Sequence, residues 1–90
     1  MAGGRPSKGL QQRYPELEEH ASWFRQALAD AGCGSVHEFL RRGPFEKNKV
    51  YGVFTATRLL TLEYTQSLAV ALKRDPTHVI PIWTRAREGA

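Results

Sequence analysis

One stretch, residues 35–59, constrains the fold of this 90-residue chain more than any other part of its sequence. It reads SVHEFLRRGPFEKNKVYGVFTATRL, and the pair Gly43-Pro44 divides it into two segments with apolar residues at helical spacing. Glycine accepts left-handed backbone angles and proline cannot continue a helical hydrogen-bond ladder, so one helix is not expected to run through this pair. The stretch therefore predicts two short helices joined by a tight turn.

The first of these helices is expected to begin at Ser35. The Ser35 hydroxyl and the carboxylate of Glu38, three residues later, form the pattern of a capping box. In a capping box each of the two side chains accepts a backbone N–H that has no partner at the start of the helix. An apolar face follows, made up of Val36, Phe39 and Leu40.

The second helix is expected to span residues 45–55. The residues predicted to face the core are apolar, namely Phe45, Val50, Val53 and Phe54. The residues predicted to face outward are polar or aromatic, namely Glu46, Lys47, Asn48, Lys49, Tyr51 and Thr55. Two short helices, the second rich in cations and amides, are typical of a helix-turn-helix, whose second helix enters the major groove of DNA.

The segment before this stretch predicts a longer helix that begins at Pro15, because proline suits the first turn of a helix. Apolar residues recur in it at spacings of three and four and form a core stripe, namely Leu17, Ala21, Phe24, Leu28 and Ala31. Gly32 is expected to end this helix in a left-handed conformation.

Two further helices are predicted after the stretch. Thr61 is a suitable N-cap for the first of them. Its inward residues are expected to be Leu62, Leu68, Ala69 and Leu72. Asp75 followed by Pro76 is typical of another helix start, and Pro81 should kink that last helix or reset its start. No segment alternates as a strand would, so we expect one all-α domain of five short helices over residues 15–88.

The net charge of +4 is distributed unevenly along the chain. Residues 15–40 carry five acids and one cation, whereas residues 41–74 carry seven cations and two acids. A molecule with an acidic helix and a basic middle favours a polyanion as its partner. The alternative is that the basic surface serves only to keep the protein soluble.

Residues 1–14 are expected to form a disordered basic arm, because they are polar, rich in glycine and without periodicity. The segment GGRPSKG resembles the core of an AT-hook, with Gly3 where a full hook has an arginine. This resemblance implies that Arg5 contacts the minor groove of A·T-rich DNA, where the negative potential is concentrated. The alternative is a flexible, solubilising tail.

The order and spacing of these segments resemble the lambda-repressor-like helix-turn-helix domains, in particular the versions found in actinobacterial regulators. The resemblance covers residues 17–86 and includes the stretch 35–59, the helix in LTLEYTQSLAVALKRDP and the terminal HVIPIWTRA. It implies a bacterial, cytoplasmic transcriptional regulator that binds double-stranded DNA. It also implies a homodimer formed through the last helix as one mode of assembly.

The resemblance also assigns roles to individual residues of the second motif helix and its surroundings. Those expected to contact bases are Lys47, Asn48 and Tyr51. Lysine donates to guanine O6 and N7, asparagine pairs with adenine N6 and N7, and the tyrosine suits a thymine methyl or a phosphate. Those expected to contact phosphates are Arg42, Lys49, Thr55 and Arg58.

Three positions depart from the pattern of the family. Leu40 stands where the family has a small residue, often alanine, and Pro44 stands where it has glycine. Both affect the angle between the two motif helices. Gly52 stands where a long polar side chain often reads a base, and its loss lowers the expected specificity.

The opposing hypothesis is a protein–protein interaction module that uses the same fold. Ile80, Ile82 and Trp83 near the C-terminus are the candidates for a dimer seam or for a site that binds another protein. The alternative for Trp83 is a structural role, in which it closes the core against the first helix.

Other classes of function lack support in the sequence. No catalytic or cofactor-binding residues are expected, because serine, histidine and cysteine occur without partners and no glycine-rich phosphate loop is present. His20, Cys33 and His37 do not have the spacing of a metal motif, so no metal site is expected. With no membrane-spanning apolar run and a single cysteine, a reducing cytoplasm is the expected location.

Overall fold

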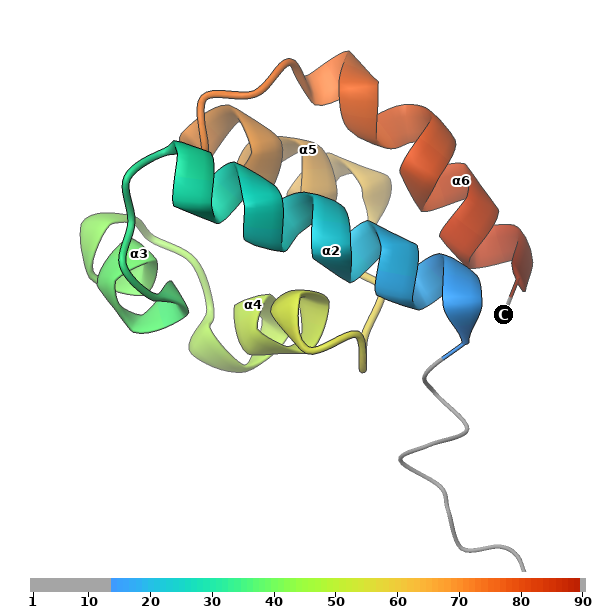
Figure 1. Ribbon diagram of the computed structural model, residues 1–90, viewed down its shortest axis with the longest axis horizontal. Helices are drawn as coiled ribbons and strands as arrows, with labels where there is room; N and C mark the ends of the chain where they lie inside the picture. The colour runs from blue at the N-terminus through green and yellow to red at the C-terminus, as the bar shows by residue number, and fades with distance from the viewer. Residues whose placement is uncertain (1–13, 90) are drawn as a thin grey trace, which may run out of the picture.

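The computed structural model describes residues 14–89, and within them the chain is all-α, as expected (Figure 1). Five α-helices and one 3-10 helix follow one another, and these residues form no strand. In chain order they are α2 (Pro15–Asp30), α3 (Val36–Arg42), α4 (Lys47–Phe54), α5 (Leu62–Ala71), η1 (Pro76–His78) and α6 (Val79–Gly89). None of these helices is both long enough and apolar enough to span a lipid bilayer.

Helix α2 is the central element of the bundle. It packs most extensively against α6 on one side and against α4 on the other. Helix α5 lies behind α2 and packs against α6 and η1, while α3 packs against α4 at one end of the molecule (Figure 1). The two motif helices, α3 and α4, are therefore held against the rest of the bundle chiefly through α2.

The sequence pattern of α2 explains this central position. The helix begins at Pro15, as predicted, and the buried residues along it recur at helical spacing. They are Leu17, His20, Ala21, Phe24, Ala27 and Leu28. Gly32 follows with φ of +80°, so the predicted left-handed residue at the end of this helix is confirmed.

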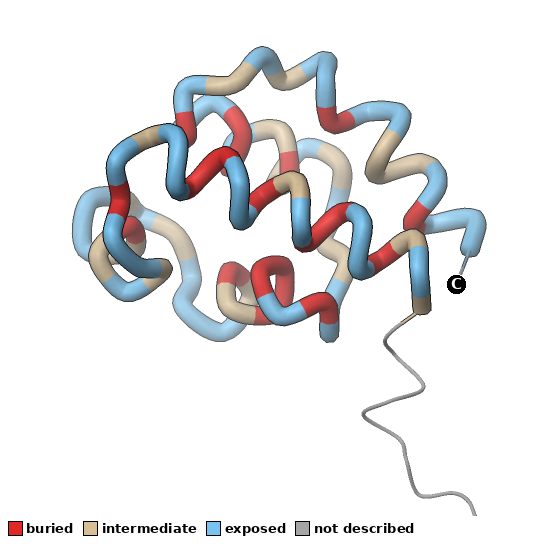
Figure 2. Tube along the Cα trace, in the orientation of Figure 1, coloured by how far each residue is buried: buried red, intermediate tan, exposed pale blue. Residues whose placement is uncertain are grey.

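The core joins all five α-helices (Figure 2). Phe24 of α2 lies edge-on to Phe54 of α4, with ring centroids 6.1 Å apart. Phe54 and Phe39 are both 4% exposed, which confirms the prediction that these two phenylalanines are buried. A second, smaller cluster brings together the start of α2, the linker after α4 and the end of α6. Its buried members are Leu17, Ala21, Ala56 and Ala86.

Both residues that were predicted to start the last helices act as N-caps, but the second of them caps a 3-10 helix. The Thr61 hydroxyl accepts the Tyr64 N–H at 3.2 Å at the start of α5. Asp75 caps the 3-10 helix η1 and not an α-helix, accepting the Thr77 N–H at 2.9 Å. Helix α6 then begins at Val79, so Pro81 lies in its first turn, where a backbone N–H has no intrahelical partner.

The start of α2 is joined to the end of α6 by polar contacts. The Tyr14 hydroxyl donates to the Ala86 carbonyl at 2.5 Å, and Arg85 pairs with Glu19 at 2.8 Å. Tyr14, assigned above to the basic arm, thus packs on the helical domain. The remainder of that arm, including the candidate Arg5, lies outside the described residues.

The indole of Trp83 in α6 is half-buried and is fixed by a hydrogen bond. Its Nε1–H donates to the Leu60 carbonyl at 2.8 Å, so it joins α6 to the segment that precedes α5. The Arg87 guanidinium lies over the same ring, 5.6 Å from its centroid. Ile80, on the same helix, is 38% exposed.

Candidate nucleic-acid interface

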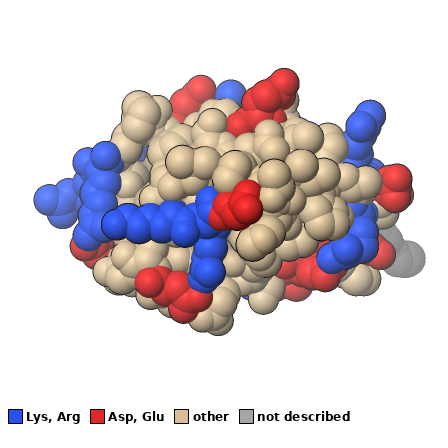
Figure 3. Space-filling view, turned by 90° about the horizontal axis from the view of Figure 1, so that it is seen from above, with Lys and Arg blue, Asp and Glu red and all other residues tan. Residues whose placement is uncertain are grey.

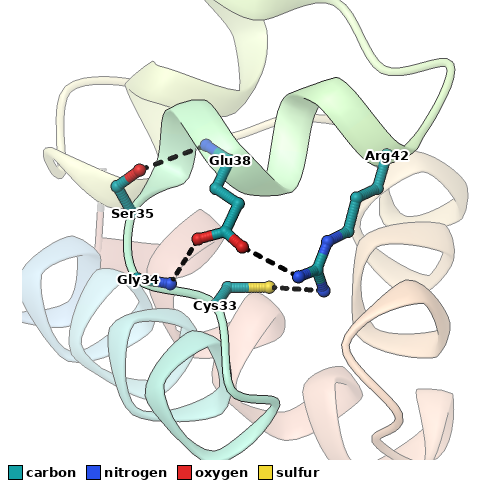
Figure 4. A network of polar contacts seen from close by, with 5 residues as sticks. All are labelled: Cys33, Gly34, Ser35, Glu38 and Arg42. Carbon is teal, nitrogen blue, oxygen red and sulfur yellow. Dashed lines mark hydrogen bonds and ion pairs between the residues drawn. The ribbon is translucent and has the colours of Figure 1, made fainter.

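The start of α3 carries a capping network that differs from the predicted box in one partner (Figure 4). The Ser35 hydroxyl accepts the Glu38 N–H at 3.1 Å, as expected. The Glu38 carboxylate, however, accepts the N–H of Gly34 at 2.9 Å and not that of Ser35. Its other oxygen accepts from Arg42 at 2.9 Å, and Arg42 also donates to the buried thiol of Cys33 at 3.4 Å. This network ties the loop after α2 to both ends of α3.

The turn between α3 and α4 forms at the predicted pair, but by a different conformation. Gly43 has φ of −139° and ψ of 171°, which is extended backbone and not the expected left-handed region. Glycine is favoured there by lack of room, because an added Cβ would lie 3.0 Å from the ring of Phe45. Pro44 then directs the chain into α4, and the connection between α3 and α4 is short, as predicted.

Helix α4 is shorter than the predicted range of 45–55. Phe45 precedes the helix, because its ring stacks on Phe39 with centroids 5.6 Å apart and an interplanar angle of 15°. Glu46 is the extended N-cap residue, and its N–H donates to the Tyr64 hydroxyl at 2.9 Å. These two tertiary contacts hold residues 45 and 46 outside the helix, which begins at Lys47. At the other end Thr55 is the C-cap residue, so that α4 ends at Phe54.

The predicted base-contacting residues lie in the first half of α4. Lys47 and Asn48 are its first two residues and both are exposed, while Tyr51, one turn later, is half-buried. Within residues 14–89 neither the Lys47 nor the Asn48 side chain takes part in a hydrogen bond or an ion pair. Both polar groups are thus available to an external partner.

Two of the predicted phosphate-contacting residues already have partners in the fold. Arg42 pairs with Glu38 at 2.9 Å, and Lys49 pairs with Glu46 at 3.3 Å and lies over the Tyr64 ring. Both pairs are solvent-exposed, so each is worth less than about 1 kcal/mol. A phosphate can therefore replace either carboxylate, although the neighbouring acid reduces the attraction.

The other two predicted phosphate-contacting residues lie at and beyond the end of α4. Thr55 is exposed, and its hydroxyl donates to the Tyr51 carbonyl at 2.7 Å. Arg58 is exposed and its aliphatic stem lies against Gly52, where an added Cβ would be 2.6 Å from the Arg58 Cβ. Gly52 is consequently buried under Arg58.

Leu40 is half-buried in α3. It packs against the main core cluster, to which Phe39 of the same helix and Val53 of α4 belong. A leucine at this position is therefore accommodated where α3 meets the bundle.

Arg25 holds α4 in place and was missed by the sequence analysis. Its Nε–H donates to the Phe54 carbonyl at the end of α4 at 2.8 Å, and its Nη1 pairs with Glu18 at 2.6 Å. A cation at the C-terminal end of a helix is stabilised by the helix dipole. Because Phe54 lies 29 positions after Arg25, no local sequence signal identifies this contact.

The cations of residues 14–89 divide into those that pair with a carboxylate and those that do not. The paired ones are Arg25, Arg42, Lys49, Arg74 and Arg85. The unpaired ones are Arg41, Lys47, Arg58, Lys73 and Arg87. Figure 3 views the side of α6, away from α4. There Lys and Arg gather at one end and extend to a carboxylate near the middle, and a smaller group lies at the other end. On the α4 side, Lys47 and Arg58 are the unpaired cations of the helix and its following linker.

Residues 14–89 contain no group of three or more His, Cys, Asp and Glu side chains that could hold a metal ion. Comparisons with protein-family models, with curated proteins and with solved structures find no match to this chain. The candidate site is therefore defined by the exposed side chains of α3, α4 and the following linker alone.

Proposed function

We propose that this chain is a DNA-binding helix-turn-helix protein of the lambda-repressor-like type, acting as a transcriptional regulator in a bacterial cytoplasm. The single observation that carries the proposal is the first turn of α4. There a short helix is docked on the bundle by its apolar face and presents the free side chains of Lys47 and Asn48 to solvent. The preceding short helix α3 and the tight turn at Gly43-Pro44 supply the rest of the motif.

In this proposal α4 lies in the major groove of double-stranded DNA. Asn48 pairs with an adenine edge, Lys47 donates to a guanine, and Tyr51 contacts a thymine methyl. Phosphates on either side are bound by residues around the helix, namely Arg42, Lys49 and Thr55. The basic arm, through Arg5, adds contacts in the minor groove.

A fluorescence titration of a duplex pool with random sequence, at two salt concentrations, tests the class of protein. A phosphate-binding protein loses affinity as salt rises, with a slope of roughly 0.9 per neutralised phosphate on a double-logarithmic plot. We expect tighter binding at low salt and a slope that corresponds to several phosphates. No binding at low salt would contradict the proposal.

Substitutions then test whether α4 is the contact surface. Asn48→Ala should weaken binding to a sequence enriched from the pool by about 1–3 kcal/mol and leave pool binding nearly unchanged, because a base contact is lost. Glu46→Gln should strengthen binding to the random duplex pool. It removes a carboxylate that repels the DNA phosphates and frees Lys49 from its ion pair. Arg87→Ala, on α6, is the matched control and should change neither measurement.

The second candidate, a protein–protein interaction module, is favoured by one observation. Val70 of α5 and Ile80 of α6 are large apolar side chains that are 57% and 38% exposed. A homodimer through α6 would cover Ile80. Sedimentation of the chain alone shows whether it associates, and the titration above then distinguishes the two roles, because an interaction module of this kind does not bind duplex DNA.

A further inference from the structure

Residue 52 lies on the outward stripe of α4 that begins at Asn48, because side chains four residues apart in a helix stand one above the other. Gly52 has no side chain to present there. Its place is covered by Arg58, since a Cβ built at residue 52 would lie 2.6 Å from the Arg58 Cβ, 3.1 Å from its Cδ and 3.4 Å from its Cγ. The stem of Arg58 therefore runs over position 52, one helical turn after Asn48.

The linker that carries Arg58 is held against α4. The Thr57 N–H donates to the Gly52 carbonyl at 3.0 Å, and the Ala56 N–H donates to the Val53 carbonyl at 3.4 Å. Ala56 itself is fully buried and adopts a left-handed backbone conformation with φ of 61°. The backbone close to Arg58 is thus fixed relative to α4 before any ligand binds, which reduces the entropy lost on binding.

The guanidinium of Arg58 is available for binding. Arg58 is exposed and forms no ion pair within residues 14–89, in contrast to Lys49 and Arg42. A guanidinium is a planar fork of donors, and its bidentate match to guanine O6 and N7 is the commonest specific contact in the major groove. A phosphate, the partner expected from the sequence, is the other group that such a fork binds.

We propose that Arg58 replaces the side chain missing at Gly52 and reads a guanine in the major groove, next to the base pair that Asn48 contacts. The inference rests on the proposed function, because it requires α4 to enter the groove. It assigns Gly52 a defined role, which is to leave room for the Arg58 stem. A base contact made in this way comes from the linker after the helix and not from the helix itself.

The experiment is enrichment of binding sites from a duplex pool with about 20 randomised base pairs, which correspond to roughly two turns of DNA. It is carried out with the unmodified chain, with Arg58→Ala and with Asn48→Ala, each checked for folding by circular dichroism. Arg58→Ala should abolish the preference for one G·C pair that lies within two base pairs of the position lost in Asn48→Ala. Its affinity for the site of the unmodified chain should fall roughly 5- to 150-fold, with a much smaller loss on the random pool.

Gly52→Ala provides an independent variant that keeps the arginine. The added Cβ cannot coexist with the Arg58 stem as placed, so the arginine must move and the same G·C preference should be lost. Arg87→Ala removes an equally unpaired arginine from α6 and should leave every preference in place. If Gly52→Ala does not fold, the comparison between Arg58→Ala and Asn48→Ala decides the question alone.

The outcomes separate the inference from the proposed function. Equal loss of affinity by Arg58→Ala for every duplex, with all base preferences retained, would mean a phosphate contact and would overturn the inference alone. A lost preference far from the Asn48 position would also overturn it. An unmodified chain that enriches no sequence and binds no pool would overturn the proposed function itself.

Discussion

His20 is a titratable residue that lies in the core without a polar partner among the described residues. The side chain is fully buried in α2, and neither ring nitrogen has a hydrogen-bond partner within residues 14–89. Its nearest aromatic neighbour is Phe24, with ring centroids 5.1 Å apart. Burial lowers the pKa of His20 from 6.5 to about 4, because the charged imidazolium loses its hydration. No charged group contributes to this shift.

Lowering the pH should therefore destabilise the fold through His20. Between pH 6.5 and about 4 the unfolded chain binds a proton that the folded chain does not. The free energy of unfolding should fall over this window by about 3 kcal/mol, at roughly 1.4 kcal/mol per pH unit. Urea unfolding at pH 7.5, 6.0, 5.0 and 4.0 measures this loss.

His20→Leu is the control that isolates this residue from the other titrating groups. It removes a buried donor without a partner, which is worth about 1–3 kcal/mol, and keeps an apolar side chain in the core. The variant should be at least as stable as the unmodified chain at pH 7.5 and markedly more stable at pH 5. The same decline of stability in both proteins would show that His20 is not responsible.

At the scale of the element, α3 depends on its cap because it is only seven residues long. Ser35→Ala removes the acceptor of the Glu38 N–H and should lower the free energy of unfolding by about 1 kcal/mol, the usual effect of losing such a cap. Ser22→Ala, at an exposed position of α2, is the matched control and should be nearly neutral. Equal effects of the two substitutions in urea unfolding would argue against the cap.

Glu38 makes the stability of the same helix, α3, depend on pH. The pKa of its carboxyl is lowered, first by the hydrogen bond from the Gly34 N–H and then by Arg42. The stabilisation is present above the ordinary pKa of a glutamate and is lost as the pH falls through the lower, folded-state value. Because the carboxyl is exposed, the effect is small beside that of His20.

The attachment of α4 can be tested with two valines that differ in burial. Val50 in α4 is fully buried, whereas Val70 in α5 is 57% exposed. Val50→Ala should lower the free energy of unfolding by about 2 kcal/mol, and Val70→Ala should have little effect. Phe54→Ala should lower it by about 3–5 kcal/mol, enough to unfold much of so small a domain. Near-native melting of Phe54→Ala would mean that the inward face of α4 is assigned wrongly.

At the scale of the whole molecule, the contact between Tyr14 and Ala86 joins residues 72 positions apart. The pKa of Tyr14 is raised, first by burial and then by the charge of Glu16, so the hydroxyl stays protonated and able to donate. Tyr14→Phe should lower the free energy of unfolding by about 1 kcal/mol and speed hydrogen exchange of the α6 amides.

Tyr51→Phe is the matched control for this substitution. The Tyr51 hydroxyl has no hydrogen-bond partner among the described residues, and the ring is half-buried in α4. Its loss should leave both stability and α6 exchange unchanged. Unchanged α6 exchange in Tyr14→Phe would contradict a role for this hydrogen bond in holding the two ends together.

Much of the helical layout could be predicted from the sequence because its signals are local. Ser35, Thr61 and Gly32 start or end helices through hydrogen bonds and backbone angles within four residues. The apolar stripe of α2 follows from the 3.6-residue period alone, and its members are buried from Leu17 to Leu28. The exposed position of Lys47 and Asn48 on α4 follows from the same period.

Only the tertiary structure decided which of the exposed polar groups are free and where α4 begins. The stacking of Phe45 and the bond from Glu46 to Tyr64 delay the start of the helix, although its sequence alone favours a start at residue 45. The cover of Gly52 by Arg58 and the bond from Arg25 to Phe54 likewise join different segments of the chain. Burial of His20 without a partner belongs to the same group. A helical period orients each side chain around its own axis, but only the packing of helices determines what that side chain meets.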